Sequence, residues 1–144
     1  MDPQALRPDL MAMLEGRGYR VTAPRKAITS LLAQKRDGFT SDEVSDELPS
    51  VGRATVYRTI KLLLEAGAVC RLAMMDGTQM YSLCGIGHHH HHWVCVECGA
   101  VKEVRAIAIE KLISEISADI PGEVIDHRLE LYVNCGLCPA TSGK

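Results

Sequence analysis

The chain has 144 residues, enough for one or two small hydrophobic cores, and its 16 Lys/Arg and 18 Asp/Glu give a net charge of −2. Residues 1–69 hold ten Lys/Arg against nine Asp/Glu (+1) and residues 70–144 six against nine (−3), which excludes bulk affinity for polyanions, so nucleic-acid binding would need a local basic patch. No apolar run approaches the ~20 residues of a membrane span, and the first residues lack the apolar core of a signal peptide, so we expect a soluble cytoplasmic protein.

The first half of the chain has the pattern of several helices followed by a hairpin. We expect helices that start near Leu6, after an N-cap at Thr22, after Thr40 or Ser41, and at Arg53. Two strands then follow, Ala68–Met74 and Gln79–Leu83, on either side of an Asp-Gly turn. Helices followed by a short hairpin are typical of a winged helix-turn-helix, a common DNA-binding module.

The second half begins after a glycine-containing hinge and has a mixed pattern. We expect strands over His89–Cys95, Ala100–Val104 and Glu123–Val133, with a helix over Ile107–Ile120 between the last two. Isoleucine and leucine form one stripe of that helix. Because about 55 residues make only a marginal core, we expect this half to need both a metal and a partner subunit.

Two Cys-x-x-Cys pairs carry the clearest chemical signal. Cys95 and Cys98 form the first pair, Cys135 and Cys138 the second, and 36 residues lie between the pairs. Four thiolates in two short pairs are the ligand set of a tetrahedral zinc site. The alternatives are two redox motifs or disulfides, which a chain without an export signal disfavours. We therefore expect the six cysteines to bind metal and not to form disulfides.

A run of five histidines, His88–His92, precedes the first pair. It continues into the apolar residues Trp93 and Val94, so we expect a strand, on which side chains alternate between two faces. The odd-numbered His89 and His91 would then face one way and the even-numbered His90 and His92 the other. One strand could supply two metal sites. A His-rich tract without defined geometry and a solvated loop are the alternatives.

Three motifs together resemble the ferric uptake regulator family, over about Leu6 to Cys138. They are Gly18–Arg25, Arg53–Thr59, and the His run leading into Cys95–Gly99. The resemblance implies a metal-responsive bacterial repressor. The implied fold class is α+β, with a winged helix-turn-helix domain in residues 1–83, a hinge in residues 84–88 and a small α/β dimerisation domain with a four-cysteine zinc site in residues 89–144.

The resemblance also implies three metal sites. The structural zinc site would use Cys95, Cys98, Cys135 and Cys138. A dimerisation-domain site would use His89, His91, Glu110 and His127. A hinge regulatory site would use Cys84, His90 and His92. Taken alone, Glu110 has the alternative of an exposed helix carboxylate, and His127 that of a core histidine.

The fourth ligand of the hinge site departs from the iron-type pattern of the family. Iron-type members contribute a His near the start of the third helix, where this chain has Lys35–Phe39 without a His. The zinc uptake regulator branch takes a ligand from just after the recognition helix, where Cys70 stands. Two thiolates and two imidazoles favour zinc. Iron or manganese stays an alternative at the non-structural sites, and a buried strand residue is the alternative for Cys70.

These expectations define a homodimeric, zinc-responsive repressor of metal uptake genes that binds double-stranded operator DNA. Its DNA contacts would be Arg20, Thr55, Tyr57 and Arg58. We expect no enzyme, no membrane association and no small organic substrate, because zinc would occupy the Cys-x-x-Cys thiolates and the sequence has no catalytic triad or phosphate-binding glycine loop. The alternatives are an iron- or peroxide-responsive regulator of the same family, and a zinc-buffering protein that does not bind DNA.

Overall fold

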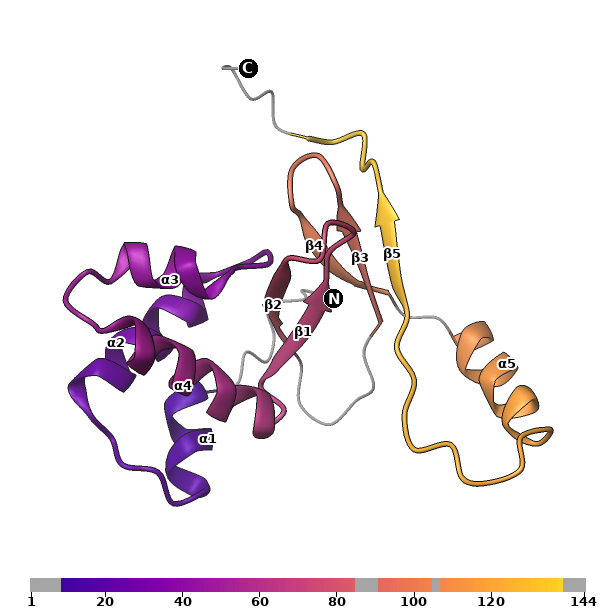
Figure 1. The fold of residues 1–144 in the computed structure, drawn as a ribbon, viewed down its shortest axis with the longest axis horizontal. Coiled ribbons are helices and arrows are strands. Elements are labelled where there is room, and N and C mark those ends of the chain that lie inside the picture. The colour runs from indigo at the N-terminus through magenta and orange to yellow at the C-terminus, as the bar shows by residue number, and fades with distance from the viewer. Residues whose placement is uncertain (1–8, 85–90, 105–106, 139–144) are drawn as a thin grey trace. The chain divides into compact units, whose positions relative to one another are not determined.

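A computed structural model describes most of the chain, namely residues 9–84, 91–104 and 107–138. The chain divides into two compact units, residues 1–88 and 89–144 (Figure 1). His89 and His90 of the expected metal sites, and all of the expected hinge except Cys84, lie outside the described residues. Within the described ranges, no helix combines the length and the apolar composition that crossing a bilayer requires.

The first unit contains four helices and a two-stranded antiparallel sheet. They are α1 (Leu10–Gly16), α2 (Ala23–Gln34), α3 (Ser41–Glu47), α4 (Arg53–Glu65), β1 (Val69–Ala73) and β2 (Gln79–Leu83). The predicted N-caps are confirmed: the Thr22 hydroxyl accepts from the Arg25 N–H at 3.3 Å, and Thr40 forms a capping box with Glu43. The hairpin turns at Gly77, whose φ of +86° suits glycine.

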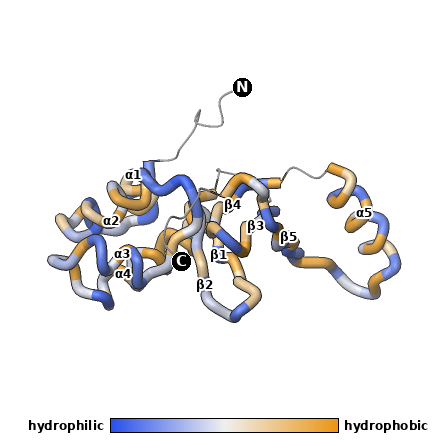
Figure 2. Tube along the Cα trace, turned by 90° about the horizontal axis from the view of Figure 1, so that it is seen from above, coloured by the Kyte–Doolittle hydropathy of each residue, from blue (hydrophilic) through white to orange (hydrophobic). Residues whose placement is uncertain are grey.

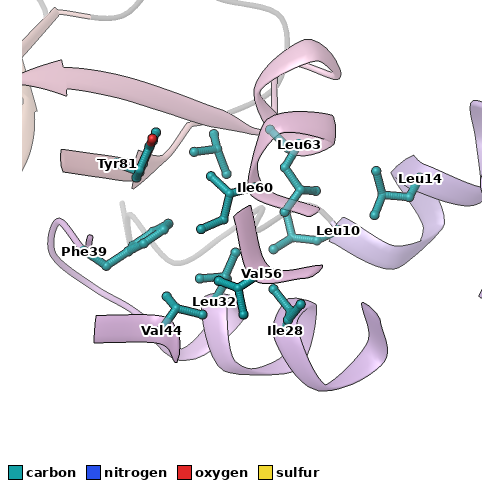
Figure 3. Close-up of a cluster of buried hydrophobic side chains, with 12 residues drawn as sticks. Leu10, Leu14, Ile28, Leu32, Phe39, Val44, Val56, Ile60, Leu63 and Tyr81 are labelled. Atoms are coloured by element: carbon teal, nitrogen blue, oxygen red, sulfur yellow. The ribbon is translucent and has the colours of Figure 1, made fainter. Parts of the chain in front are cut away.

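The core of this unit is formed by the apolar faces of all four helices. Figure 3 shows side chains of α1, α2, α3 and α4 converging, with Phe39 and Tyr81 beside them. Phe39 and Tyr81 also exchange two main-chain hydrogen bonds of 2.8 Å, which attach the α2–α3 connection to β2. Helices packed against a two-stranded hairpin form a winged helix, so the predicted module is confirmed.

The second unit contains a three-stranded sheet and one helix. Its elements are β3 (His91–Cys95), β4 (Val101–Val104), α5 (Ile107–Ser117) and β5 (Glu130–Val133). The strand order is β4-β3-β5, with β3 antiparallel to β4 and parallel to β5. The helix α5 therefore lies in the crossover that a parallel pair requires.

Two predicted boundaries in this unit are wrong. The helix ends at Ser117 and not at Ile120, because the last turn before Pro121 tightens into i→i+3 hydrogen bonds, of which Asp119 N–H to Ile116 O is 3.0 Å. The last strand starts at Glu130 and not at Glu123. Its ladder with β3 begins at the pair His92–Glu130, so only its final four residues find a partner in the register.

The apolar stripe of α5 is exposed. Figure 2 shows apolar and polar residues alternating along this helix, as expected for an amphipathic helix. None of its residues is buried, and Leu112 is 54% and Ile116 49% exposed. Within the described part of one chain, α5 therefore does not bury its apolar stripe in a core of this unit.

Candidate metal centres

The four cysteines of the two Cys-x-x-Cys pairs are brought together at one end of the second sheet. Cys95 ends β3 and Cys135 follows β5, and because these strands run parallel their ends lie side by side. The turn after Cys95 closes at Gly99 (φ +75°), whose N–H donates to the Cys95 carbonyl oxygen at 3.0 Å, so that Cys98 lies back beside Cys95. Gly136 (φ +65°) turns the chain between Cys135 and Cys138. The four Sγ atoms all lie within 4.8 Å of one another.

The sulfur separations fit one zinc ion. Cys95 to Cys138 is 3.6 Å, Cys98 to Cys135 is 3.8 Å, and Cys135 to Cys138 is 3.5 Å between Sγ atoms. A tetrahedron with about 2.3 Å from its centre to each sulfur has edges of about 3.8 Å. The donor set and its spacing are therefore those of a closed tetrahedral site with no position left for a substrate.

The electrostatics of the four thiols favour a bound cation. Backbone N–H groups of Cys98 and Cys135 lower the pKa of Cys95 to about 6, and the Cys135 N–H lies 3.5 Å from the Cys95 sulfur. In contrast, the neighbouring sulfurs of Cys135 and Cys95 raise the pKa of Cys138 to about 12. The four thiols resist losing all their protons together unless a dication offsets the accumulated negative charge.

A second cluster contains His91, Glu110 and His127. His91 is 2% exposed on β3, Glu110 lies in the first turn of α5, and His127 comes from the segment before β5. The Glu110 Oε1 atom lies 2.5 Å from His91 Nε2 and 3.3 Å from His127 Nε2. Two imidazole nitrogens and one carboxylate oxygen suit zinc, iron or manganese.

Glu110 is not simply an exposed helix carboxylate, and His127 is not a core histidine. Glu110 contacts both histidines and is not merely a solvated carboxylate. The His127 side chain is 24% exposed, and Ile125 on the same predicted strand face is 92% exposed, so that face is not a core. His89, the fourth expected ligand, lies outside the described residues.

Cys70 and Cys84 are joined by a disulfide in the structure, with 5.8 Å between their Cα atoms. The expectation that none of the six cysteines forms a disulfide is therefore wrong for this pair. The physical reason is the hairpin register. Cys70 pairs with Ser82, and Cys84 lies two residues beyond Ser82, so both cysteines project from the same face as diagonal neighbours.

The other members of the expected hinge set lie elsewhere in the chain. Cys70 and Cys84 belong to the first unit, whereas His92, 4% exposed, belongs to the second. His90 lies outside the described residues. The four-residue hinge set therefore stays a prediction.

The helix α4 carries three of the four residues expected to contact DNA, and the fourth, Arg20, precedes α2. Tyr57 is 55% exposed, Arg58 is exposed, and the Arg58 guanidinium lies 3.5 Å from the Thr55 hydroxyl. A shallow pocket between α4 and the hairpin is lined by Tyr57 together with the cationic Lys61 and Arg71. Arg58, Lys61 and Arg71 therefore give α4 and the hairpin local positive charge.

Two arginines that the sequence reasoning did not single out hold these elements in place. Arg53, the first residue of α4, donates to Asp42 at 2.7 Å and to Asp46 at 3.3 Å and so ties α4 to α3. Arg25 donates to the Arg20 carbonyl oxygen at 2.9 Å, and its guanidinium lies 5.7 Å from the Tyr19 ring centroid. The two aspartates of α3 and the arginine that follows the α3–α4 turn could have predicted the ion pairs of Arg53. Nothing in the periodicity distinguished Arg25.

Known proteins share this architecture. The model of the Ferric uptake regulator family matches residues 16–132. A ferric uptake regulation protein of Bacillus subtilis (strain 168) is 36% identical over 138 residues, which cover 91% of each chain. The Vibrio cholerae ferric uptake regulator structure has a TM-score of 0.67 at 33% identity and covers 86% of this chain and 98% of that one. A zinc uptake regulator complexed with zinc and DNA has a TM-score of 0.67 at 25% identity and covers 87% of each chain.

A winged helix followed by a small α/β domain that gathers cysteine and histidine clusters defines a metal-responsive transcriptional regulator and not an enzyme. The matches above extend over both units. The chain belongs to the Ferric uptake regulator family.

Proposed function

We propose that this regulator is a cytoplasmic, homodimeric, zinc-responsive repressor of metal uptake genes that binds double-stranded operator DNA. The observation that carries the proposal is the combination, in one chain, of a winged helix with an exposed Tyr57–Arg58 face and two clusters of metal-binding side chains. A buffering protein would need the clusters but not the exposed basic face.

In this proposal α4 is the recognition helix. Arg58 and Tyr57 read base edges in the major groove, Thr55 supports Arg58, and Arg20 contacts the backbone or the minor groove. Lys61 and Arg71, which line the pocket beside Tyr57, supply further positive charge toward phosphates. The relative solved with zinc and DNA supports this use of the winged helix.

We assign the four cysteines of the second unit to structural zinc. The closed tetrahedral spacing leaves no open coordination position, and the site joins the β3–β4 turn to the segment after β5. Its binding energy is then largely folding energy, so this zinc is a permanent part of the fold and not the sensor.

We assign sensing to Cys70, Cys84, His90 and His92, and a third site to His89, His91, Glu110 and His127. The two sulfurs of the sensor set support zinc as the regulatory metal, because thiolates favour zinc over harder cations. Metal that binds the DNA-binding conformation more tightly shifts the population toward that conformation. By the same linkage, bound DNA raises the affinity for the metal.

The exposed stripe of α5 supports a dimer. Leu112 and Ile116 are about half exposed on a helix that buries none of its residues in a single chain, and Ile120, in the turn that follows the helix, is 46% exposed. A second copy of the same domain would cover this stripe with an identical one, as a two-fold interface requires.

Iron is the second candidate for the regulatory metal. The relatives named as ferric uptake regulation proteins favour it, and the nitrogen and oxygen donors of His91, Glu110 and His127 can bind ferrous iron. Under this alternative, Cys70 is a structural residue of β1 and not a sensor ligand.

A DNA-binding titration against free zinc, ferrous iron and manganese tests the proposal. We expect zinc to promote operator binding at the lowest free concentration, and chelation to reverse it. Cys84→Ser should keep the fold and the structural zinc but lose zinc-dependent DNA binding, whereas the matched Ser82→Ala should respond like the unaltered protein. DNA binding that ignores every metal would exclude a metal sensor, and a response to iron alone would favour the second candidate.

A further inference from the structure

Cys70 and Cys84 are held in a geometry that suits a disulfide as well as a metal. Their Cα atoms are 5.8 Å apart, at the centre of the range observed for disulfides, about 5.5–6 Å. Ladder pairs Val69–Leu83 and Cys70–Ser82, and the hydrogen bond from the Cys84 N–H to the Ala68 carbonyl oxygen at 3.0 Å, fix both backbones. The two sulfurs can therefore join or separate by side-chain rotation without a change in the hairpin.

The two cysteines differ in their exposure. Cys70 is half-buried in β1, whereas Cys84 is 3% exposed. An oxidant in solution therefore reaches Cys70 first, and Cys84 is placed to attack the oxidised sulfur. An accessible thiol beside a resolving cysteine is the arrangement of a reversible thiol switch.

We infer that Cys70 and Cys84 form a reversible disulfide whose formation excludes metal from these two sulfurs, so that oxidation of the pair silences the sensor. The inference rests on the proposed function, which makes both sulfurs sensor ligands. Metal binding needs thiolates, and a disulfide offers none. Zinc and oxidation then compete for the same pair, and bound zinc protects it.

The oxidation balances with a hydroperoxide as the oxidant. The Cys70 thiolate attacks one oxygen of hydrogen peroxide, the O–O bond breaks, and the second oxygen leaves as water, which yields the sulfenic acid of Cys70. The Cys84 thiolate then attacks that sulfur and displaces a second water. Two thiols lose two electrons and two protons in total, and one peroxide is reduced to two waters. A dithiol reductant reverses the reaction by thiol–disulfide exchange.

The four-cysteine cluster of the second unit provides an internal comparison. Its four sulfurs are arranged around one position, so each is a ligand whenever structural zinc is bound. The Cys70/Cys84 pair supplies only two sulfurs, and its remaining sensor ligands are imidazoles that do not join a disulfide. We therefore expect oxidation to select the hairpin pair while the structural zinc is retained.

The experiment uses the full chain with its structural zinc in place, after a mild chelator has removed any weaker metal. The protein is treated with stoichiometric hydrogen peroxide, and the linked peptides are identified by mass spectrometry. Zinc content and zinc titration are measured before and after reduction with a dithiol. Parallel samples are Cys70→Ser, the matched Ser82→Ala, and protein preincubated with zinc.

The expected result is a Cys70–Cys84 linkage, unchanged structural zinc, loss of about one zinc-binding equivalent per chain from the titration, and recovery of that equivalent after reduction. Ser82→Ala should behave like the unaltered chain, Cys70→Ser should form no such linkage, and zinc preloading should slow it. Oxidation of Cys95 or Cys138 before the hairpin pair would overturn the inference, as would a linked pair with unchanged zinc titration. Zinc-dependent DNA binding of the reduced protein is measured separately, so failure of the proposed function is recognised independently of this result.

Discussion

The two units of this regulator differ in how they bury apolar surface. In the first unit, Leu14, Ile28, Leu32 and Leu63 are completely buried among four helices. In the described part of the second, the fully buried apolar residues are few, and α5 buries none. The first unit therefore has a hydrophobic core of its own, whereas we propose that the second is stabilised by metal ligation and by a second copy of itself.

Removal of one zinc ligand should have the largest effect, and it should fall on the second unit alone. Cys98→Ser should abolish zinc binding at the four-cysteine site, whose contribution to folding is about 10–16 kcal/mol for small zinc domains, and with it the dimer. The first unit should stay folded. Metal analysis, sedimentation and amide spectra of the two units would measure these effects.

Cys70→Ser is the matched control, because it removes a thiol from the first unit by the same substitution. It should retain both the structural zinc and the dimer. A metal-free, folded and dimeric Cys98→Ser protein would contradict the assignment of a structural role to this zinc.

Two leucine substitutions should distinguish a side chain buried within one chain from a side chain buried only in the dimer. Leu63 is 0% exposed in α4, so Leu63→Ala should lower the free energy of unfolding of the first unit by about 2–5 kcal/mol. Leu112, 54% exposed in α5, should instead weaken dimerisation when replaced by Ala. Chemical denaturation and sedimentation equilibrium distinguish the two outcomes. Equal effects on monomer stability would show that α5 packs within its own chain.

Loss of Arg58 should affect DNA binding without disturbing the second unit. Arg58→Ala should weaken operator binding by about 1–3 kcal/mol, the usual value for a base-contacting arginine, while zinc content and dimerisation stay unchanged. Fluorescence anisotropy with operator and scrambled duplexes measures the loss. Lys111→Ala, which removes one positive charge from α5, controls for net charge. Unchanged affinity in Arg58→Ala would place recognition elsewhere.

The smallest expected effect is local to the start of α3. Thr40→Ala removes the hydroxyl that accepts from the Glu43 N–H at 3.1 Å and should cost about 1 kcal/mol of stability in the first unit alone. Thermal unfolding of the two units, followed separately, measures it. Thr40→Ser retains the cap and should restore most of the loss. A shift in the unfolding of the second unit would mean that the units unfold together.

Most of the first unit could be predicted from local sequence signals. The α4 boundaries, the caps at Thr22 and Thr40 and the hairpin all follow from periodicity, capping residues and turn chemistry, which act within a few residues. The Cys-x-x-Cys spacing likewise predicts the four-sulfur cluster, because each pair is itself local.

The errors lie where distant residues decide the structure. The start of β5 depends on where β3 can pair with it, and the disulfide between Cys70 and Cys84 depends on a hairpin register that residue counts do not give. Glu110 and His127 are inconspicuous in the sequence and become neighbours of His91 only through the fold. Family resemblance supplied them, not periodicity.

The parallel pairing of β3 with β5 has a consequence for how the chain folds. About 35 residues separate these strands, and a slip of their register by a single residue would turn the side chains of β5 to opposite faces of the sheet and carry Cys135 away from Cys95. Only the correct alignment places all four sulfurs around one point. If the proposed structural zinc binds there, it favours the aligned chains, and metal content would then report the fraction of molecules with the correct register.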